Sequence, residues 1–116
     1  MIQTDYLIIG SGIAGLSFAL KVAENDPQKS ITIVTKADQH ESNTRYAQGG
    51  IATVTDLEKD SFEDHIKDTI IAGDGVCEPE VVKMVVSKAP ERLQELIKWG
   101  TDFDKTDQGN YDLGKE

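Results

Sequence analysis

The chain is short of the residues on which several classes of protein depend. Its 116 residues include a single cysteine, Cys77, so an internal disulfide framework and a cysteine-rich metal site are both excluded. No apolar run approaches the roughly 20 residues that a membrane-spanning helix needs, and no membrane insertion is expected. The opening segment MIQTDYLIIG lacks the basic region of a secretory signal, which favours a cytoplasmic location.

Positive charge is also scarce. The chain has 12 Lys and Arg against 21 Asp and Glu, which gives a formal net charge of -9 at pH 7. Because the acids are dispersed along the sequence, the chain repels phosphate backbones, and nucleic-acid binding is not expected. Hydrophobic residues still make up 38% of the sequence, as in ordinary folded domains, so we expect one small domain or part of one.

Residues 1–36 predict a βαβ unit. The segment Asp5 to Ile9 is short, apolar and stopped by a glycine, which is typical of a strand buried on both faces. From Leu16 to Glu24 the apolar residues recur at helical spacing, and from Ser30 to Thr35 β-branched residues cluster. The order of strand, glycine turn, helix and strand indicates a parallel pair of strands.

The segments on either side of the remaining helical region read as irregular structure. Residues 37–60 show no helical period and predict a long ordered loop, and loops of that length are usually functional. Residues 101–116 form a polar, turn-rich tail that looks unfinished. Two parallel strands with a few helices cannot give a sheet covered on both faces, and a doubly wound fold needs further βα units. The sequence therefore predicts an incomplete domain, a fragment of something larger.

Residues 61–100 predict helices. The first helix begins at a pattern similar to a capping box, formed by Ser61 and Asp64 three residues later. Gly73 and Gly75 end this helix. A second helix begins at Pro79 with valines on its apolar face, and a break is expected at Ala89-Pro90. A last helix then ends before Gly100, which is expected to act as its C-terminal glycine.

The sequence Gly10-Ser-Gly-Ile-Ala-Gly15 stands between the first predicted strand and the first helix. In that context the GxGxxG pattern predicts a site for the pyrophosphate of a dinucleotide. Gly10 permits the tight turn, Gly12 leaves room for the pyrophosphate, and Gly15 lets the helix pack closely on the strand. The N-terminus of the helix then faces the phosphates.

Lys36 stands where such sites usually carry an acid for the adenosine ribose. A lysine can only donate hydrogen bonds, so it could bond a ribose hydroxyl oxygen or attract a phosphate. By this residue alone NADP is as fair a ligand as FAD, and a solvated surface lysine is an equal alternative.

The stretch Ser42-Asn-Thr-Arg-Tyr-Ala-Gln-Gly-Gly-Ile-Ala52 carries a more specific pattern. Its Ala47-Gln-Gly-Gly50 core resembles the flavin-contacting loop of the succinate dehydrogenase and fumarate reductase flavoprotein family, and within it the L-aspartate oxidases. Paired glycines allow backbone N–H groups to approach a flat ring and tune its electron affinity. The similarity continues through Asp64-His65, Asp68-Thr69, Ala72-Gly73, Cys77, Trp99-Gly100 and Phe103-Asp104.

The resemblance implies an α/β fold, a Rossmann-like FAD-binding βαβ unit followed by helices, in an incomplete doubly wound domain. It also implies these cofactor-binding residues: Gly10, Ser11, Gly12, Ile13, Ala14, Gly15, Lys36, Asn43, Thr44, Arg45, Tyr46, Ala47, Gln48, Gly49 and Gly50. Succinate dehydrogenases and fumarate reductases carry a histidine, covalently joined to the flavin, at the position of Asn43. Asparagine cannot make that bond, so non-covalent FAD is expected.

The same resemblance implies an enzyme that oxidises L-aspartate to iminoaspartate. Hydride would pass from Cα to flavin N5, oxygen or fumarate would reoxidise the flavin, and the product would feed quinolinate and NAD synthesis, with quinolinate synthase as a candidate partner. Glu116 aligns with a glutamate that lies near the substrate in these oxidases. No catalytic residue is expected within the 116 residues, which alone should be inactive. A soluble fumarate reductase or succinate dehydrogenase-type flavoprotein and a non-catalytic nucleotide-binding module are the alternatives.

The remaining reactive side chains read as structural. His65 lies beside apolar residues of a predicted helix without a second ligand or nucleophile, which favours a packing role over catalysis. His40 lies in a polar run and is expected to be exposed. Cys77 has no neighbouring base to activate it and reads as a small apolar filler. No metal site is expected.

Overall fold

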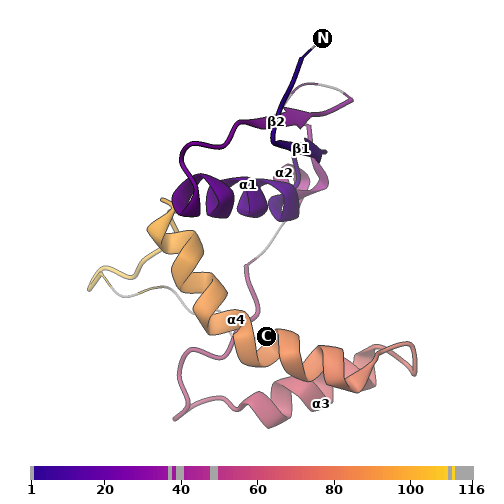
Figure 1. Cartoon of the computed structure of the whole chain (residues 1–116). Coiled ribbons are helices and arrows are strands. Elements are labelled where there is room, and N and C mark those ends of the chain that lie inside the picture. Colours follow the sequence, from indigo (N-terminus) through magenta and orange to yellow (C-terminus); the bar gives the residue numbers. More distant parts are fainter. Residues whose placement is uncertain (1, 37, 39–40, 48–49, 110, 112–116) are drawn as a thin grey trace. The chain divides into compact units, whose positions relative to one another are not determined.

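The computed structural model describes residues 2–36, 38, 41–47, 50–109 and 111, which form two compact units (Figure 1). The first unit, Met1–Gly49, holds strands β1 (Tyr6–Ile9) and β2 (Ile31–Val34) and helices α1 (Ile13–Asn25) and α2 (Asn43–Tyr46). The second, Gly50–Glu116, holds helices α3 (Phe62–Ala72) and α4 (Pro79–Lys98). The boundary between the units falls within the loop predicted for residues 37–60.

The two strands of the first unit pair in parallel, as the sequence predicts. Their register runs from Tyr6 opposite Ile31 to Ile9 opposite Val34. Beyond the last pair, the Gly10 N–H donates to the Val34 carbonyl oxygen at 2.8 Å, so the glycine turn starts directly from the sheet. The α1 helix connects the strands, which confirms the βαβ unit.

Side chains fasten the two strands together at their N-terminal ends. The Asp5 carboxylate accepts hydrogen bonds from the Ser30 N–H at 2.9 Å and the Ser30 hydroxyl at 2.8 Å. It also pairs with the Lys29 ammonium group, at 3.2 Å. The bonds from Ser30, with a smaller contribution from Lys29, lower the pKa of Asp5 from its ordinary 3.8 to about 2. The carboxylate is therefore ionised over almost the whole accessible pH range.

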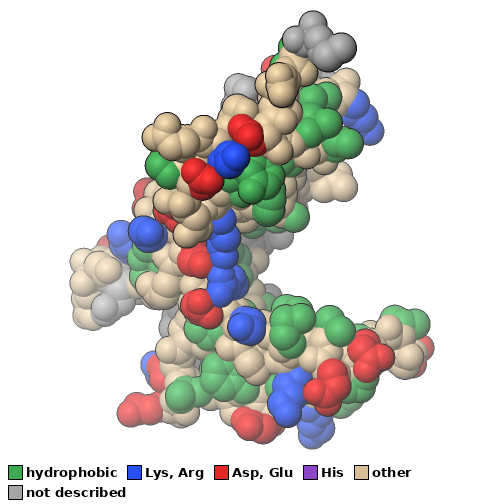
Figure 2. Space-filling model, viewed as in Figure 1, with side chains coloured by type: hydrophobic (Ala, Val, Ile, Leu, Met, Phe, Trp, Pro, Cys, Tyr) green, Lys and Arg blue, Asp and Glu red, His purple; other side chains and the backbone are tan. Residues whose placement is uncertain are grey.

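Only one face of the sheet is buried, which corrects the expectation for β1. Ile8 is buried and Tyr6 meets Phe18 of α1 edge to face, with ring centroids 5.8 Å apart. Leu7 and Ile9 point to the opposite face and are 58% and 85% exposed. In the described part of this unit α1 packs on one face alone, and Figure 2 shows hydrophobic side chains reaching the surface around the strands.

A short helix interrupts the segment for which a loop was predicted. The α2 helix spans only Asn43–Tyr46, too few residues to show a hydrophobic period. Ser42 begins it, because the Ser42 hydroxyl accepts a hydrogen bond from the Arg45 N–H at 3.3 Å. The local signal for this helix is therefore the N-cap serine at position 42 and not a hydrophobic period.

The start of α3 follows the predicted pattern. The Asp64 N–H donates to the Ser61 Oγ at 3.0 Å, and the Ser61 hydroxyl donates in turn to the Asp64 carboxylate at 2.7 Å. Two acids, Glu63 and Asp64, lie in the first turn, where the helix dipole favours negative charge. Ser61 is therefore the N-cap that the sequence indicates.

The turn after α3 is packed around Cys77. A Cβ atom on Gly73 would overlap the Cys77 Sγ, and this thiol contacts the Thr69 carbonyl oxygen at 3.6 Å. Asp74 and Gly75 then take positive φ values of 45° and 83° to reverse the chain. Cys77 is half-buried and fills the space that Gly73 leaves open, which is the packing role expected of it.

The break predicted at Ala89-Pro90 is wrong, because α4 is one helix with Pro90 inside it. Proline removes one N–H and crowds the preceding turn, which bends a helix without necessarily ending it. Figure 1 shows α4 changing direction near its middle. Gly100 does end the helix, with φ of 99°, and the Thr101 N–H donates to the Leu96 carbonyl at 3.0 Å.

Candidate functional site

The glycine turn between β1 and α1 has the geometry that its sequence requires. Gly10 has a φ of 99°, a conformation that side chains disfavour. At Gly15 a Cβ atom would lie 2.9 Å from the Ile8 Cγ2 and 3.0 Å from the Gly10 carbonyl oxygen. The first glycine therefore makes the turn, and the third lets α1 pack on β1.

Gly12 is different, since nothing in the described chain forbids a side chain there. A Cβ atom on Gly12 would meet the Thr44 Oγ1 at 3.8 Å, an ordinary contact. Its φ of -77° is open to any residue. The backbone at Gly12, next to the start of α1, is therefore open to a ligand that approaches from the protein surface.

The start of α1 is arranged to receive an anion. Gly12 is the N-cap and supplies no side-chain cap, and no acid lies in the first turn. N–H groups of a first turn have no carbonyl partner within their helix and carry the positive end of its dipole. One of them, from Ile13, donates to the Thr44 hydroxyl at 3.1 Å.

Ser11 adds a buried hydroxyl to this turn. The residue is 7% exposed, and its Oγ has no hydrogen-bond partner in the part of the chain that the structure describes. An unpaired buried hydroxyl costs about 1–3 kcal/mol. An acceptor on a bound molecule would remove that cost, so Ser11 and the first turn of α1 together fit a phosphate group.

The other predicted cofactor residues lie in or near α2, and most are exposed. Asn43, Thr44 and Arg45 belong to this helix with Tyr46, and Ala47 follows it directly. The Tyr46 hydroxyl donates to the Glu41 carboxylate at 2.7 Å, which raises the pKa of Tyr46 above its ordinary value. No sequence pattern predicts this bond, because Tyr and Glu side chains are both common on exposed surfaces without pairing.

The other residues predicted to bind the cofactor or the substrate lie in different parts of the chain. Lys36 is exposed two residues beyond β2. Gly50 belongs to the second unit. Gln48, Gly49 and Glu116, together with His40, lie outside the described residues. Within the first unit, the structure thus brings Thr44 to the glycine turn and leaves Lys36 at the end of its strand.

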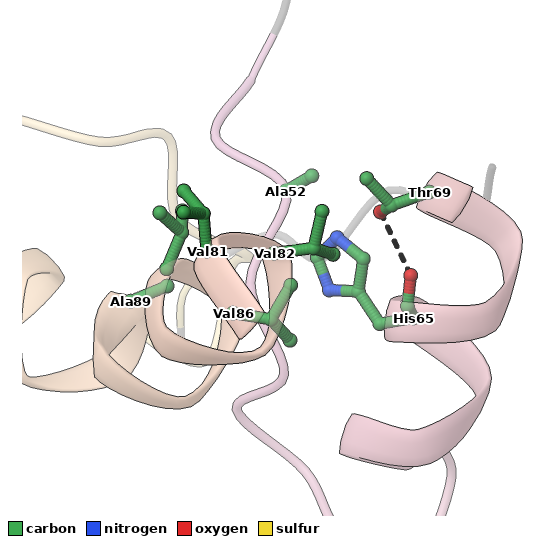
Figure 3. A pocket seen from close by; sticks show the side chains of 8 residues that line it. Ala52, His65, Thr69, Val81, Val82, Val86 and Ala89 are labelled. Atoms are coloured by element: carbon green, nitrogen blue, oxygen red, sulfur yellow. Dashed lines mark hydrogen bonds between the residues drawn. The ribbon is translucent and has the colours of Figure 1, made fainter. Parts of the chain in front are cut away.

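A separate pocket of about 240 Å³ lies between α3 and α4 of the second unit (Figure 3). The residues that line it are mostly apolar: Ala52, His65, Thr69, Val81, Val82, Val85, Val86 and Ala89. The His65 ring points toward Val82 and Val86, and the Thr69 hydroxyl donates to the His65 carbonyl oxygen at 2.8 Å. The pocket thus offers few polar groups to a ligand, in keeping with the packing role expected of His65.

Two other features are absent from the described residues. No helix among them is long and apolar enough to cross a membrane. In the same part of the chain no three His, Cys, Asp or Glu side chains come together as a metal site.

Comparison with known proteins bears directly on the glycine turn. The family model for the FAD binding domain matches residues 5–116. The chain belongs to this FAD-binding family. FAD is therefore the cofactor of the domain, which decides between the two dinucleotides that Lys36 left open.

Several curated relatives of this FAD-binding chain are named L-aspartate oxidase. L-aspartate oxidase 2-b, chloroplastic, of Nicotiana tabacum is 47% identical over 112 residues, which are 97% of this chain and 17% of the relative. L-aspartate oxidase of Vibrio cholerae is 46% identical over 110 residues, 95% of this chain and 20% of the relative. The chain thus spans about a fifth of the length of the relatives that it matches.

Solved structures share the fold. The FrdA chain of E. coli quinol fumarate reductase, in a mutant form, matches with a TM-score of 0.86 and 34% identity over 97% of this chain and 19% of that one. The Mycobacterium smegmatis Sdh1 complex matches with a TM-score of 0.82 and 29% identity, over 97% and 19% of the two chains. The α/β arrangement with a small parallel sheet is therefore that of a Rossmann-like FAD-binding fragment.

Proposed function

We propose that the natural protein uses non-covalently bound FAD to oxidise L-aspartate to iminoaspartate. The observation that carries the proposal is the 46–47% identity to enzymes named L-aspartate oxidase along nearly all of this chain. The site chemistry agrees with it, because the glycine turn and the buried Ser11 hydroxyl fit a phosphate-bearing cofactor. The chain itself supplies the cofactor-binding part of that activity.

The predicted cofactor-binding residues would each contact a different part of FAD. The first turn of α1 and the Ser11 hydroxyl bind the pyrophosphate, since both offer donors to an anion. Lys36 donates to the adenosine ribose or a phosphate, and the segment from Asn43 to Gly50 lies along the flavin. Bound FAD supplies a two-electron acceptor for the hydride that leaves the substrate Cα.

Asn43 supports a cofactor that is held without a covalent link. An amide nitrogen is not nucleophilic, whereas the imidazole found at this position in succinate dehydrogenases and fumarate reductases can bond to the flavin. The exposed Leu7 and Ile9 support further βα units on the open face of the sheet, as a doubly wound domain would have. Such units would bring further residues that bind the dicarboxylate substrate.

Glu116 is proposed as the group that distinguishes aspartate from succinate. Aspartate carries an ammonium group that succinate lacks, and a carboxylate beside it forms a charge-assisted hydrogen bond. The oxidant would be oxygen or fumarate. The iminoaspartate released would enter quinolinate and NAD synthesis in the cytoplasm, with quinolinate synthase as the enzyme that consumes it.

A soluble fumarate reductase or succinate dehydrogenase-type enzyme is the second candidate. It is favoured by the structural matches to quinol fumarate reductase and Sdh1 chains at 34% and 29% identity. Anaerobic addition of substrates to the natural holoprotein separates the two. Bleaching of the oxidised flavin band by aspartate and not by succinate supports the oxidase. Bleaching by succinate alone would establish the fumarate reductase or succinate dehydrogenase-type enzyme. A natural protein that binds no flavin would be a non-catalytic nucleotide-binding module.

A further inference from the structure

The α2 helix is tied to the start of α1 through one hydroxyl. The Ile13 N–H, at the first position of α1, donates to the Thr44 Oγ1 at 3.1 Å across 31 residues of sequence. The same oxygen is the nearest atom to the place where a Cβ of Gly12 would stand, at 3.8 Å. Thr44 therefore lies directly beside the turn that fits the pyrophosphate.

The α2 helix holds its own shape but depends on Thr44 for its position. Its four residues are closed by the Ser42 cap and by the Tyr46 hydroxyl on Glu41. A helix this short gains little from its own hydrogen bonds and needs tertiary contacts to stay in place. In the described part of the first unit, no other hydrogen bond joins α2 to α1 or to the sheet.

The bond also concerns the phosphate-binding turn itself. The Ile13 N–H is one of the first-turn donors that have no partner within α1. When the Thr44 hydroxyl accepts this bond, its own proton stays free to turn toward another acceptor. Two parts of the cofactor site thus meet at Thr44: the turn that fits the pyrophosphate, and the segment expected along the flavin.

We propose that Thr44 is a positioning residue that couples these two parts of the cofactor site. Through its bond to Ile13 it fixes α2, and the segment from Asn43 to Ala47, in the place where the flavin ring is received. The inference rests on the proposed function, since it needs that segment to contact the flavin. Removal of the hydroxyl releases the flavin-contacting segment and leaves the phosphate-binding turn intact.

Calorimetric titration of the natural protein, freed of cofactor, with two ligands tests the coupling. FAD engages both parts of the site, whereas ADP carries a diphosphate and no flavin. Thr44→Val keeps the shape of the side chain without its hydroxyl and should weaken FAD binding about tenfold, the upper range for one hydrogen bond, while ADP changes less than about twofold. Thr44→Ser restores the hydroxyl and should restore FAD affinity. Thr55→Val, at an exposed threonine of the second unit, is the matched control.

Hydrogen exchange of the cofactor-free protein gives a readout that does not depend on the ligand. The peptide that holds the Ile13 amide should exchange faster in Thr44→Val and at the wild-type rate in Thr44→Ser. If the valine variant does not fold, Thr44→Ala serves for the same comparison. Equal weakening of FAD and ADP would make Thr44 a phosphate ligand and overturn the positioning role, as would unchanged FAD affinity. A wild-type protein that binds ADP but no FAD would instead sink the proposed function.

Discussion

Gly15 of α1 stands so close to Ile8 of β1 that an added Cβ atom would lie 2.9 Å from the Ile8 Cγ2. The Gly10 carbonyl oxygen, at 3.0 Å from the same point, belongs to the backbone and cannot turn aside. Close packing of the helix on the strand thus depends on this glycine. Gly15 thus packs directly beside Ile8, one of the three apolar residues that are buried in the described part of the chain.

Gly15→Ala should lower the free energy of unfolding by about 1–3 kcal/mol, the usual cost of overpacking, even after the better helix propensity of alanine. Chemical denaturation of the cofactor-free protein measures this. Gly12→Ala is the matched control, because its Cβ would meet only an ordinary contact at 3.8 Å. That variant should keep its stability and lose FAD affinity. Equal stability of the two variants would contradict the packing role of Gly15.

Ser11→Ala should separate cofactor binding from folding. The Ser11 hydroxyl is buried without a described partner, so its removal leaves the stability of the cofactor-free protein unchanged or slightly higher. FAD affinity should fall about tenfold or more, because a hydrogen bond to a charged group contributes roughly 1.5–3 kcal/mol. Fluorescence titration with FAD and thermal melting give the two quantities. Ser87→Ala on the exposed surface of α4 is the control, and a loss of stability without a loss of affinity would count against the role of Ser11.

Asp5 should make the protein sensitive to acid. Its pKa falls from 3.8 to about 2 on folding, so it stabilises the native state fully above about pH 4. That contribution is lost as the pH falls through the folded value, when the carboxylate gains a proton in both states. Asp5→Asn should be less stable at pH 6 and lose less stability between pH 4 and pH 2. Parallel pH-dependence of the variant and the wild type in denaturation experiments would contradict this.

The flavin should leave the protein when the protein is denatured. Asn43 stands where a histidine would form the covalent link, so acid precipitation should give a colourless pellet and a yellow supernatant. A quantitative check compares the flavin in the supernatant with the total bound beforehand. Flavin that stays with the pellet would show a covalent bond formed by another residue.

Glu116→Gln should change the preference of the natural enzyme between its substrates. Loss of the carboxylate removes a charge-assisted contact with the aspartate ammonium group, and fumarate has no such group. The ratio of kcat/KM for aspartate oxidation to kcat/KM for fumarate reduction should fall about tenfold, equivalent to roughly 1.4 kcal/mol. Steady-state assays of both reactions on one preparation measure it. An equal fall in both activities would deny Glu116 a discriminating role.

The sequence alone determined those features that depend on neighbouring residues. Glycine spacing between a β-prone run and a helical period predicted the turn from Gly10 to Gly15, because turn, strand and helix preferences act over a few residues. The Ser61 cap and the glycine that ends α4 at position 100 followed from local chemistry in the same way. These features could be predicted since each is satisfied within its own segment.

Tertiary structure decided what depends on distant partners. Pro90 was expected to break a helix, yet α4 continues through it, because a proline costs one hydrogen bond that packing along the helix can offset. The exposure of Ile9 follows from how many elements cover the sheet, which no local pattern reports. The bond between Ile13 and Thr44 joins residues 31 apart, and only the folded chain brings that hydroxyl to the first turn of α1.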